Sequence, residues 1–278
     1  MIKKLGTTNF KRPGTRQRGV LSSLSIIVPK YIYEVRRWRD YLLAPPTSNY
    51  LIDLENLIIP LKSTGLFYQL DKLGILATEQ QQHARVDLID PTATQITEVN
   101  SPTWTANLGY KGDGSTKYLN TNATFANSKF FTQNSASFGV YILENIEESG
   151  ADIGATHGAN RRTALHTRFA TNTCFTILNE SGGPSYTNTD SRGMYVVKRN
   201  GTIRNDYKNG VNVRAFSPST SEVPSTHNVY LLGRNENGAL GFPSTRRNAM
   251  YFWGSGDIDH TMFYNIFQDF AKKRGFAV

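Results

Sequence analysis

The stretch NSPTWTANLGYKGDGSTKYLNT, Asn100–Thr121, marks the point at which the chain changes from helical to strand-like patterns. It carries three bulky apolar residues that suit a first strand: Trp104, Leu108 and Tyr110. The run Gly112-Asp113-Gly114-Ser115 follows, and it supplies the backbone freedom and the side-chain hydrogen bonds of a turn. Residues 117–120 predict the returning strand. We interpret the stretch as the entrance to a β-sandwich.

The residues after this entrance have the pattern of antiparallel strands. Residues 136–143 alternate with a strict period of two, which is the clearest strand signal in the chain. Asn200-Gly201 and Asn209-Gly210 each separate two β-prone runs and predict hairpins, because a type I′ turn needs positive φ angles. Since no strand–helix–strand alternation is present, we expect an antiparallel β-sandwich. Further expected strands are Thr163–Phe169, Cys174–Leu178, Met194–Lys198, Val229–Arg234 and Met250–Gly254.

Helical patterns precede the entrance, and one helix closes the chain. Apolar spacing predicts helices at 31–43, 48–61, 66–73 and 79–88, with Ser48 as an N-cap. The last helix has Asp257 or Asp259 as its cap, an apolar stripe through residues 262–271, and Gly275 at its end. We therefore divide the chain into an N-terminal arm and helix (1–47), a helical neck (48–94) and a sandwich with a terminal helix (95–278).

The positive charge is concentrated at the N-terminus. The net charge is +9, and residues 1–40 hold ten basic and two acidic side chains, whereas the other 238 residues hold 21 and 20. Such an arm suits docking to a protein neighbour. Residues 1–19 contain Phe10 as their one aromatic residue, which does not favour nucleic acid. The anchoring residues that we predict are Lys3, Lys4, Lys11, Arg12, Arg16 and Arg18.

Cysteine content and hydropathy bear on disulfide formation, membrane insertion and secretion. Cys174 is the one cysteine, so no intrachain disulfide forms, and its apolar neighbours favour an inert core thiol. No run of 18 or more apolar residues exists, so we expect no membrane insertion. A secretory signal is a poor fit, because residues 20–28 are short and interrupted by serine. Stability then depends on packing and on association into a homo-oligomer.

Four segments occur in an order that resembles a known module. They are LIDLENLIIPLKSTGLFYQLDKL (51–73), a linker from Asp87 to Thr121, FFTQNSASFGVYILE (130–144) and HTMFYNIFQDFAKKRG (260–275). This order resembles a module of tailed-bacteriophage virion proteins, in tail fibres and related appendages, which is similar to concanavalin A-like (laminin G-like) jelly-roll domains. The run YKNGVNV, Tyr207–Val213, also resembles a hairpin of laminin G-like domains. The resemblance implies a jelly-roll fold and a virion location.

The sequence gives little support for a catalytic site or a metal site. Jelly-roll glycosidases place two glutamates and an aspartate on one strand, but the nearest string here, Glu144 with Glu147 and Glu148, lacks the aspartate and lies before a turn. The histidines have no zinc-ligand spacing, so we predict no metal site. Calcium among Asp113, Asp152 and Asp190 is the one cofactor alternative left open. We therefore expect a protein that is not an enzyme.

Sugar binding is the remaining site chemistry, because sugar rings pack on aromatic faces while amide and guanidinium groups bond hydroxyls. The candidate ligand-binding residues are Tyr186, Tyr207, Arg234, Asn235 and Trp253. Our prediction is a structural protein of a phage virion, anchored by its arm, whose lectin-like head recognises host-surface glycan. A bacterial carbohydrate-binding module and, behind it, a jelly-roll glycoside hydrolase are the alternatives.

Overall fold

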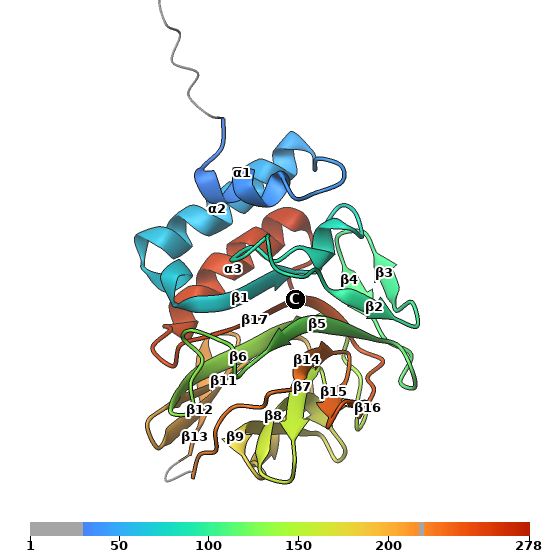
Figure 1. Ribbon diagram of the computed structural model, residues 1–278, viewed down its shortest axis with the longest axis vertical. Coiled ribbons are helices and arrows are strands. Elements are labelled where there is room, and N and C mark those ends of the chain that lie inside the picture. The colour runs from blue at the N-terminus through green and yellow to red at the C-terminus, as the bar shows by residue number, and fades with distance from the viewer. Residues whose placement is uncertain (1–29, 217–219) are drawn as a thin grey trace, which may run out of the picture. The chain divides into compact units, whose positions relative to one another are not determined.

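The computed structural model describes residues 30–216 and 220–278, and residues 31–278 form one compact unit (Figure 1). The basic residues predicted as anchors and the strand expected at 20–28 lie outside the described residues. The unit contains helices, a sheet of eight strands and a sheet of nine strands. Among the strand pairs of the described chain, all are antiparallel except that between β15 and β7. The predicted mainly β, sandwich-like class is confirmed.

The eight-stranded sheet has the order β13-β12-β11-β6-β17-β4-β3, and β1 also pairs with β17. Its strands are β1 (Leu70–Ile75), β3 (Thr103–Thr105), β4 (Gly109–Lys111), β6 (Ser135–Ile142), β11 (Gly193–Asn200), β12 (Ile203–Lys208), β13 (Val211–Phe216) and β17 (Arg247–Gly254).

The nine-stranded sheet has the order β10-β9-β8-β7-β14-β5-β2, with β15 beside β7 and β16 beside β15. Its strands are β2 (Thr97–Val99), β5 (Tyr118–Thr124), β7 (Ile153–His157), β8 (Arg161–Phe169), β9 (Thr173–Glu180), β10 (Ser185–Thr187), β14 (Asn228–Leu231), β15 (Arg234–Glu236) and β16 (Ala239–Gly241).

Two apolar cores lie on opposite faces of the eight-stranded sheet. Phe138 and Val140 of β6 belong to the core between the two sheets, whereas Tyr141 belongs to the core under the helices. The period of two in residues 136–143 therefore fills both cores, because successive side chains of a strand point to opposite faces. Figure 1 shows α3 between this sheet and the two N-terminal helices, so the sheet is covered on both sides.

The α-helices within residues 30–216 and 220–278 are α1 (Tyr33–Arg39), α2 (Ser48–Ser63) and α3 (His260–Arg274). The predicted features of α3 are confirmed: the Asp259 carboxylate accepts a hydrogen bond from the Met262 amide at 2.9 Å, and Gly275 ends the helix at φ 76°. For α2, the predicted cap was one residue late, because Thr47 accepts from the Tyr50 amide at 3.2 Å.

Two predicted helices of the neck are wrong. Residues 66–69 form a 3-10 turn (Leu66–Gln69) and continue as strand β1, while 79–88 holds only the short 3-10 turn His83–Arg85. Pairing with β17 overrides the helical spacing of the leucines, and a Cβ at Gly74 would lie 2.0 Å from the Tyr251 ring. Tertiary pairing thus decides the structure here, as it commonly does against weak local propensity.

The turn at 112–115 is confirmed, but it joins the two sheets and does not close a hairpin. The strand before it, β4, lies in the eight-stranded sheet, and β5 after it lies in the nine-stranded sheet. Asp113 accepts hydrogen bonds from the amides of Ser115, Thr116 and Lys117 at 2.9, 2.8 and 2.9 Å. These bonds lower the pKa of the Asp113 carboxyl well below its usual range.

Both predicted hairpins are present. Asn209 (φ 49°) and Gly210 (φ 75°) join β12 to β13 and have the two positive φ angles of a type I′ turn. The β11–β12 turn is formed one residue later than predicted, by residues 201–202, and only Gly201 has a positive φ, 62°.

Candidate functional site

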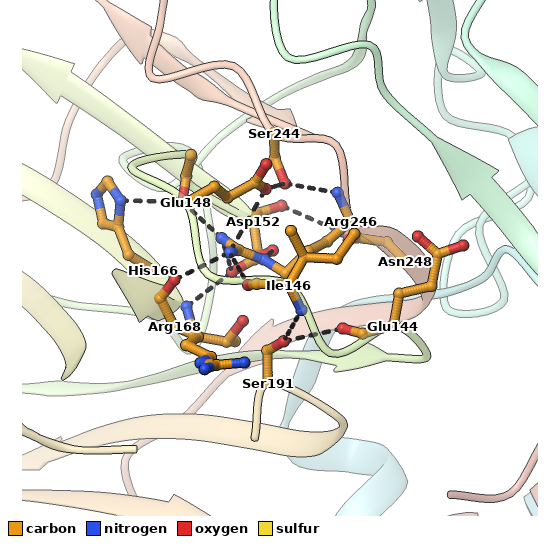
Figure 2. Close-up of polar contacts among 12 residues, drawn as sticks. Glu144, Ile146, Glu148, Asp152, His166, Arg168, Ser191, Ser244, Arg246 and Asn248 are labelled. Carbon is orange, nitrogen blue, oxygen red and sulfur yellow. Dashed lines mark hydrogen bonds and ion pairs between the residues drawn. The ribbon is translucent and has the colours of Figure 1, made fainter. Parts of the chain in front are cut away.

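A buried ion pair connects the two sheets at one end of the sandwich (Figure 2). The Arg246 guanidinium, immediately before β17, donates from Nε and Nη2 to the two carboxylate oxygens of Asp152, immediately before β7, at 2.7 and 3.0 Å. Both side chains are fully buried, at 0 % exposure. The remaining donors of Arg246 reach the carbonyls of Ile146, Arg168 and Gly150 at 3.1, 3.2 and 2.6 Å. A bidentate pair with this degree of hydrogen bonding fixes both partners in position.

Glu148 attaches the loop before β7 to the segment that carries Arg246. Its carboxylate accepts hydrogen bonds from the Ser244 hydroxyl and the Thr245 amide, at 2.6 and 2.9 Å, and lies 3.4 Å from Arg246 Nη1. Asp152 in turn accepts a bond from the Thr167 amide of β8 at 2.8 Å. The ion pair therefore also fixes β8 and the loop at Gly150.

His166 of β8 is bound to this network through the Gly150 carbonyl. Its Nδ1 lies 3.1 Å from that oxygen, and a carbonyl accepts only, so Nδ1 carries the proton. Burial, together with the positive charges of Arg234 and Arg246, lowers the pKa of His166 to about 3. The imidazole is thus neutral, and its Nε2 is a buried hydrogen-bond acceptor with no partner in the described part of the chain.

His166 lines a pocket of about 270 Å³ on the outer face of the nine-stranded sheet. Leu165 and Cys174 belong to the core between the sheets, so their neighbours His166 and Phe175 point to the opposite face. We call this site the aromatic pocket, and define it by Arg162, His166, Phe169, Phe175, Ile177, Gly182, Arg234 and Phe242.

Aromatic rings form most of the wall of the aromatic pocket. The His166 ring lies 5.3, 5.7 and 5.4 Å from those of Phe169, Phe175 and Phe242, measured between centroids. The Arg234 guanidinium lies over the Phe242 ring at 4.4 Å. Phe242 is 40 % exposed, and Phe169 and Phe175 are half-buried, so this wall is partly open to solvent.

Two guanidinium groups complete the aromatic pocket. The Nε atoms of Arg162 and Arg234 are buried and have no hydrogen-bond partner among residues 30–216 and 220–278. Arg234 also forms an ion pair with Glu236. The site therefore offers two N–H donors and the His166 Nε2 acceptor around apolar ring surfaces. Buried polar atoms without partners are rare in folded proteins, and they indicate a place for water or a ligand.

The five predicted ligand-binding residues lie in separate places. Arg234 lines the aromatic pocket, while Asn235 stabilises its own turn by donating to the Asn228 carbonyl and accepting from the Gly238 amide, at 2.9 and 2.7 Å. Tyr186 packs against the core between the sheets, and Trp253 is buried in it. Tyr207 contacts His260 under the helices, at 5.3 Å between ring centroids.

The sequence analysis did not identify His166 or the phenylalanines as pocket residues. Arg162 and His166 are four residues apart on β8, which begins two residues before the expected strand Thr163–Phe169, and this spacing places both on one face. This spacing is the signal in the sequence that could have identified the two residues as neighbours on one face. The contributions of β9 and Phe242 depend on strand order, which no local pattern contains.

The carboxylates considered for catalysis or calcium are engaged in structural contacts. Glu144 pairs with Lys111 at 2.7 Å, and Glu147 with Arg168 at 3.4 Å. Asp190 pairs with Arg192 at 2.8 Å, while Asp113 and Asp152 hold the turn and the ion pair described above. Within the described ranges no group of three or more metal-ligating side chains occurs.

Burial raises the pKa of the Cys174 thiol. Separately, no helix in the described ranges is long and apolar enough to cross a membrane.

Neither a family model nor a curated protein matches this sequence. Among solved structures, the fold is similar to Trypanosoma rangeli sialidase in complex with sialic acid (TM-score 0.48, 9 % identity, 77 % of this chain and 38 % of that chain). It is also similar to the receptor-binding domain of botulinum neurotoxin C/D mosaic serotype (TM-score 0.47, 12 % identity, 72 % and 51 %) and to NanB sialidase from Streptococcus pneumoniae (0.36, 13 %, 43 % and 22 %). The chain thus spans about half or less of the length of each. None of these three is a phage protein, so the virion location stays a prediction.

Replacing Asp152 with asparagine tests the ion pair. We expect Asp152→Asn to lower the free energy of unfolding by about 3–5 kcal/mol, because it leaves a buried guanidinium without its counter-charge. Asp190→Asn is the matched control at an exposed pair, where the loss should be much smaller. Urea unfolding followed by fluorescence measures both, and equal losses would contradict the importance of the buried pair.

The protonation state of His166 gives a prediction on pH. With a folded pKa of about 3 against an unfolded value of about 6.5, the imidazole binds protons more readily in the unfolded chain. It therefore stabilises the fold fully above pH 6.5, and this contribution is lost as the pH falls towards 3. Nitrogen-15 NMR should show the neutral tautomer protonated at Nδ1 from pH 8 down to about pH 4. Titration of His166 near its ordinary pKa would refute this assignment.

Proposed function

We propose that this protein binds glycan through the aromatic pocket. The observation that carries the proposal is the combination in one pocket of a histidine acceptor, two arginine Nε–H donors and several phenyl faces. A sugar hydroxyl both donates and accepts hydrogen bonds, so one polyol can satisfy both kinds of group. The C–H faces of a sugar ring pack against aromatic rings. A purely apolar ligand would leave the three nitrogen atoms unsatisfied.

The dimensions of the pocket favour a short ligand. At about 270 Å³ it lies just below the range of roughly 300–1,000 Å³ that is common for small-molecule sites. One or two sugar rings suit this volume better than an extended chain.

Binding is better supported than hydrolysis. Glycosidases use a pair of carboxyl groups that flank the scissile bond. No aspartate or glutamate belongs to the described residues that line the aromatic pocket. The glutamates at 144–148 are occupied by ion pairs and by the Ser244–Thr245 segment. We therefore propose that the protein binds glycan without hydrolysing it.

Filling the pocket tests the proposal. A Cβ at Gly182 meets no atom within 4 Å, and its φ lies outside the positive region, so Gly182→Leu should fold normally and occupy the pocket. We expect a glycan array to show binding by the wild type and a loss of at least tenfold in Gly182→Leu.

Gly182→Ala, a minimal change at the same site, is the control. Gly158→Leu is less suitable, because Gly158 has a φ of 65°, a backbone conformation that larger side chains rarely adopt. Normal binding by Gly182→Leu would show that glycan is bound elsewhere. Absence of binding to any glycan by the wild type would refute the proposal.

We propose, further, that this head belongs to a phage virion appendage, as a homo-oligomer attached through its N-terminal arm to other virion proteins. The proposal is supported by the resemblance of the sequence to phage appendage modules and by the concentration of charge in residues 1–40. A bacterial carbohydrate-binding module is the alternative, and such a protein would not be part of a phage particle.

Deletion of residues 1–30 tests the anchoring role. We expect the shortened protein to remain folded, because residues 31–278 are a compact unit by themselves, and to be missing from purified particles. Mass spectrometry of particles assembled with either form measures incorporation. Equal incorporation would refute anchoring by the arm, and absence of the full-length chain from particles would refute the virion location.

A further inference from the structure

We propose that the glycan bound in the aromatic pocket is acidic, and that its carboxylate pairs with Arg162. This inference rests on the proposed function and specifies its ligand class. Two positive side chains, Arg162 and Arg234, line the pocket, and Glu236 pairs with the second. Within the described ranges no carboxylate lies within ion-pair distance of the Arg162 guanidinium. The pocket therefore has one positive charge that the protein leaves unbalanced.

The environment of Arg162 makes this imbalance informative. An exposed arginine needs no partner, because water solvates its charge. The Nε of Arg162 is buried and has no hydrogen-bond partner, while the residue as a whole is half-buried. A neutral hydroxyl would satisfy that donor but would leave the charge uncompensated, whereas a carboxylate satisfies both. Arg246, the other guanidinium near His166, is already neutralised by Asp152.

His166 limits which acids fit. Its Nε2 requires a donor, because the Nδ1 proton is committed to the Gly150 carbonyl. An ionised carboxylate cannot donate, so the ligand must also present a hydroxyl to this nitrogen. A simple aliphatic acid lacks that hydroxyl, and a neutral sugar lacks the charge. A hydroxylated carboxylic acid such as a uronic acid meets both requirements, with its ring face on the phenylalanines.

The experiment compares matched sugars on the full-length protein. Glucuronate, galacturonate and mannuronate are each titrated beside the parent hexose and beside the uronamide, which has the shape of the acid without its charge. Saturation-transfer NMR or calorimetry gives the affinities. We expect at least one uronate to bind about tenfold more tightly than its hexose and its amide, since a hydrogen bond to a charged group exceeds a neutral one by about that factor.

Two variants assign the difference to the proposed residue. Arg162→Gln keeps a side-chain N–H donor but removes the positive charge, so it should abolish the preference for the uronate over its hexose and its amide. Arg161→Gln removes the same charge from the neighbouring position, which does not line the pocket, and should retain the preference for the acid. Added sodium chloride should weaken uronate binding more than hexose binding.

The outcomes separate this inference from the proposed function. Equal affinity for acid, amide and hexose, with all binding lost in Gly182→Leu, would overturn the acidic ligand and leave glycan binding in place. Preference for the acid that survives Arg162→Gln would overturn the role of Arg162. Glucose 6-sulfate that binds more tightly than every uronate would overturn the carboxylate in favour of a sulfate ester. No binding of any sugar would overturn both proposals.

Discussion

The buried pairing of Arg246 with Asp152 is the interaction on which the architecture of this end of the sandwich depends. Arg246 precedes β17 of the eight-stranded sheet and Asp152 precedes β7 of the nine-stranded sheet, and both side chains of this bidentate contact are fully buried. A buried ion pair of this kind contributes little net stability compared with an apolar pair, but breaking it is strongly unfavourable. Its role is therefore to specify position. It holds the loop at Gly150, the start of β7 and the segment before β17 in one arrangement.

The same contact reaches the aromatic pocket through a single carbonyl. Gly150 accepts from Arg246 at 2.6 Å and from His166 at 3.1 Å, so the oxygen that completes the ion pair also sets the tautomer of the histidine. Structural and binding roles are thus combined in one hydrogen-bond network.

The sequence predicts well those features that local chemistry determines. The period of two in residues 136–143 identified β6, and the cap at Asp259 with the stop at Gly275 defined α3. The strand β1 was missed because its leucines have helical spacing and only the distant β17 makes them extended. For the site, Arg234 was identified by its residue type. His166, Phe175 and Phe242 come together through strand order and loop position, which a single sequence does not encode locally.

The hairpin of β15 and β16 has a consequence for how ligand preference can change over evolution. Its attachment to β7 is a parallel pairing of only two residue pairs, Asn235 with Ala155 and Glu236 with Thr156, unlike the long antiparallel ladders of the sandwich. Yet this hairpin supplies Arg234 and leads into Phe242. One wall of the binding site is therefore a small hairpin at the edge of the sandwich, so related chains can acquire new ligands by changing residues 234–242 while the long antiparallel ladders stay the same.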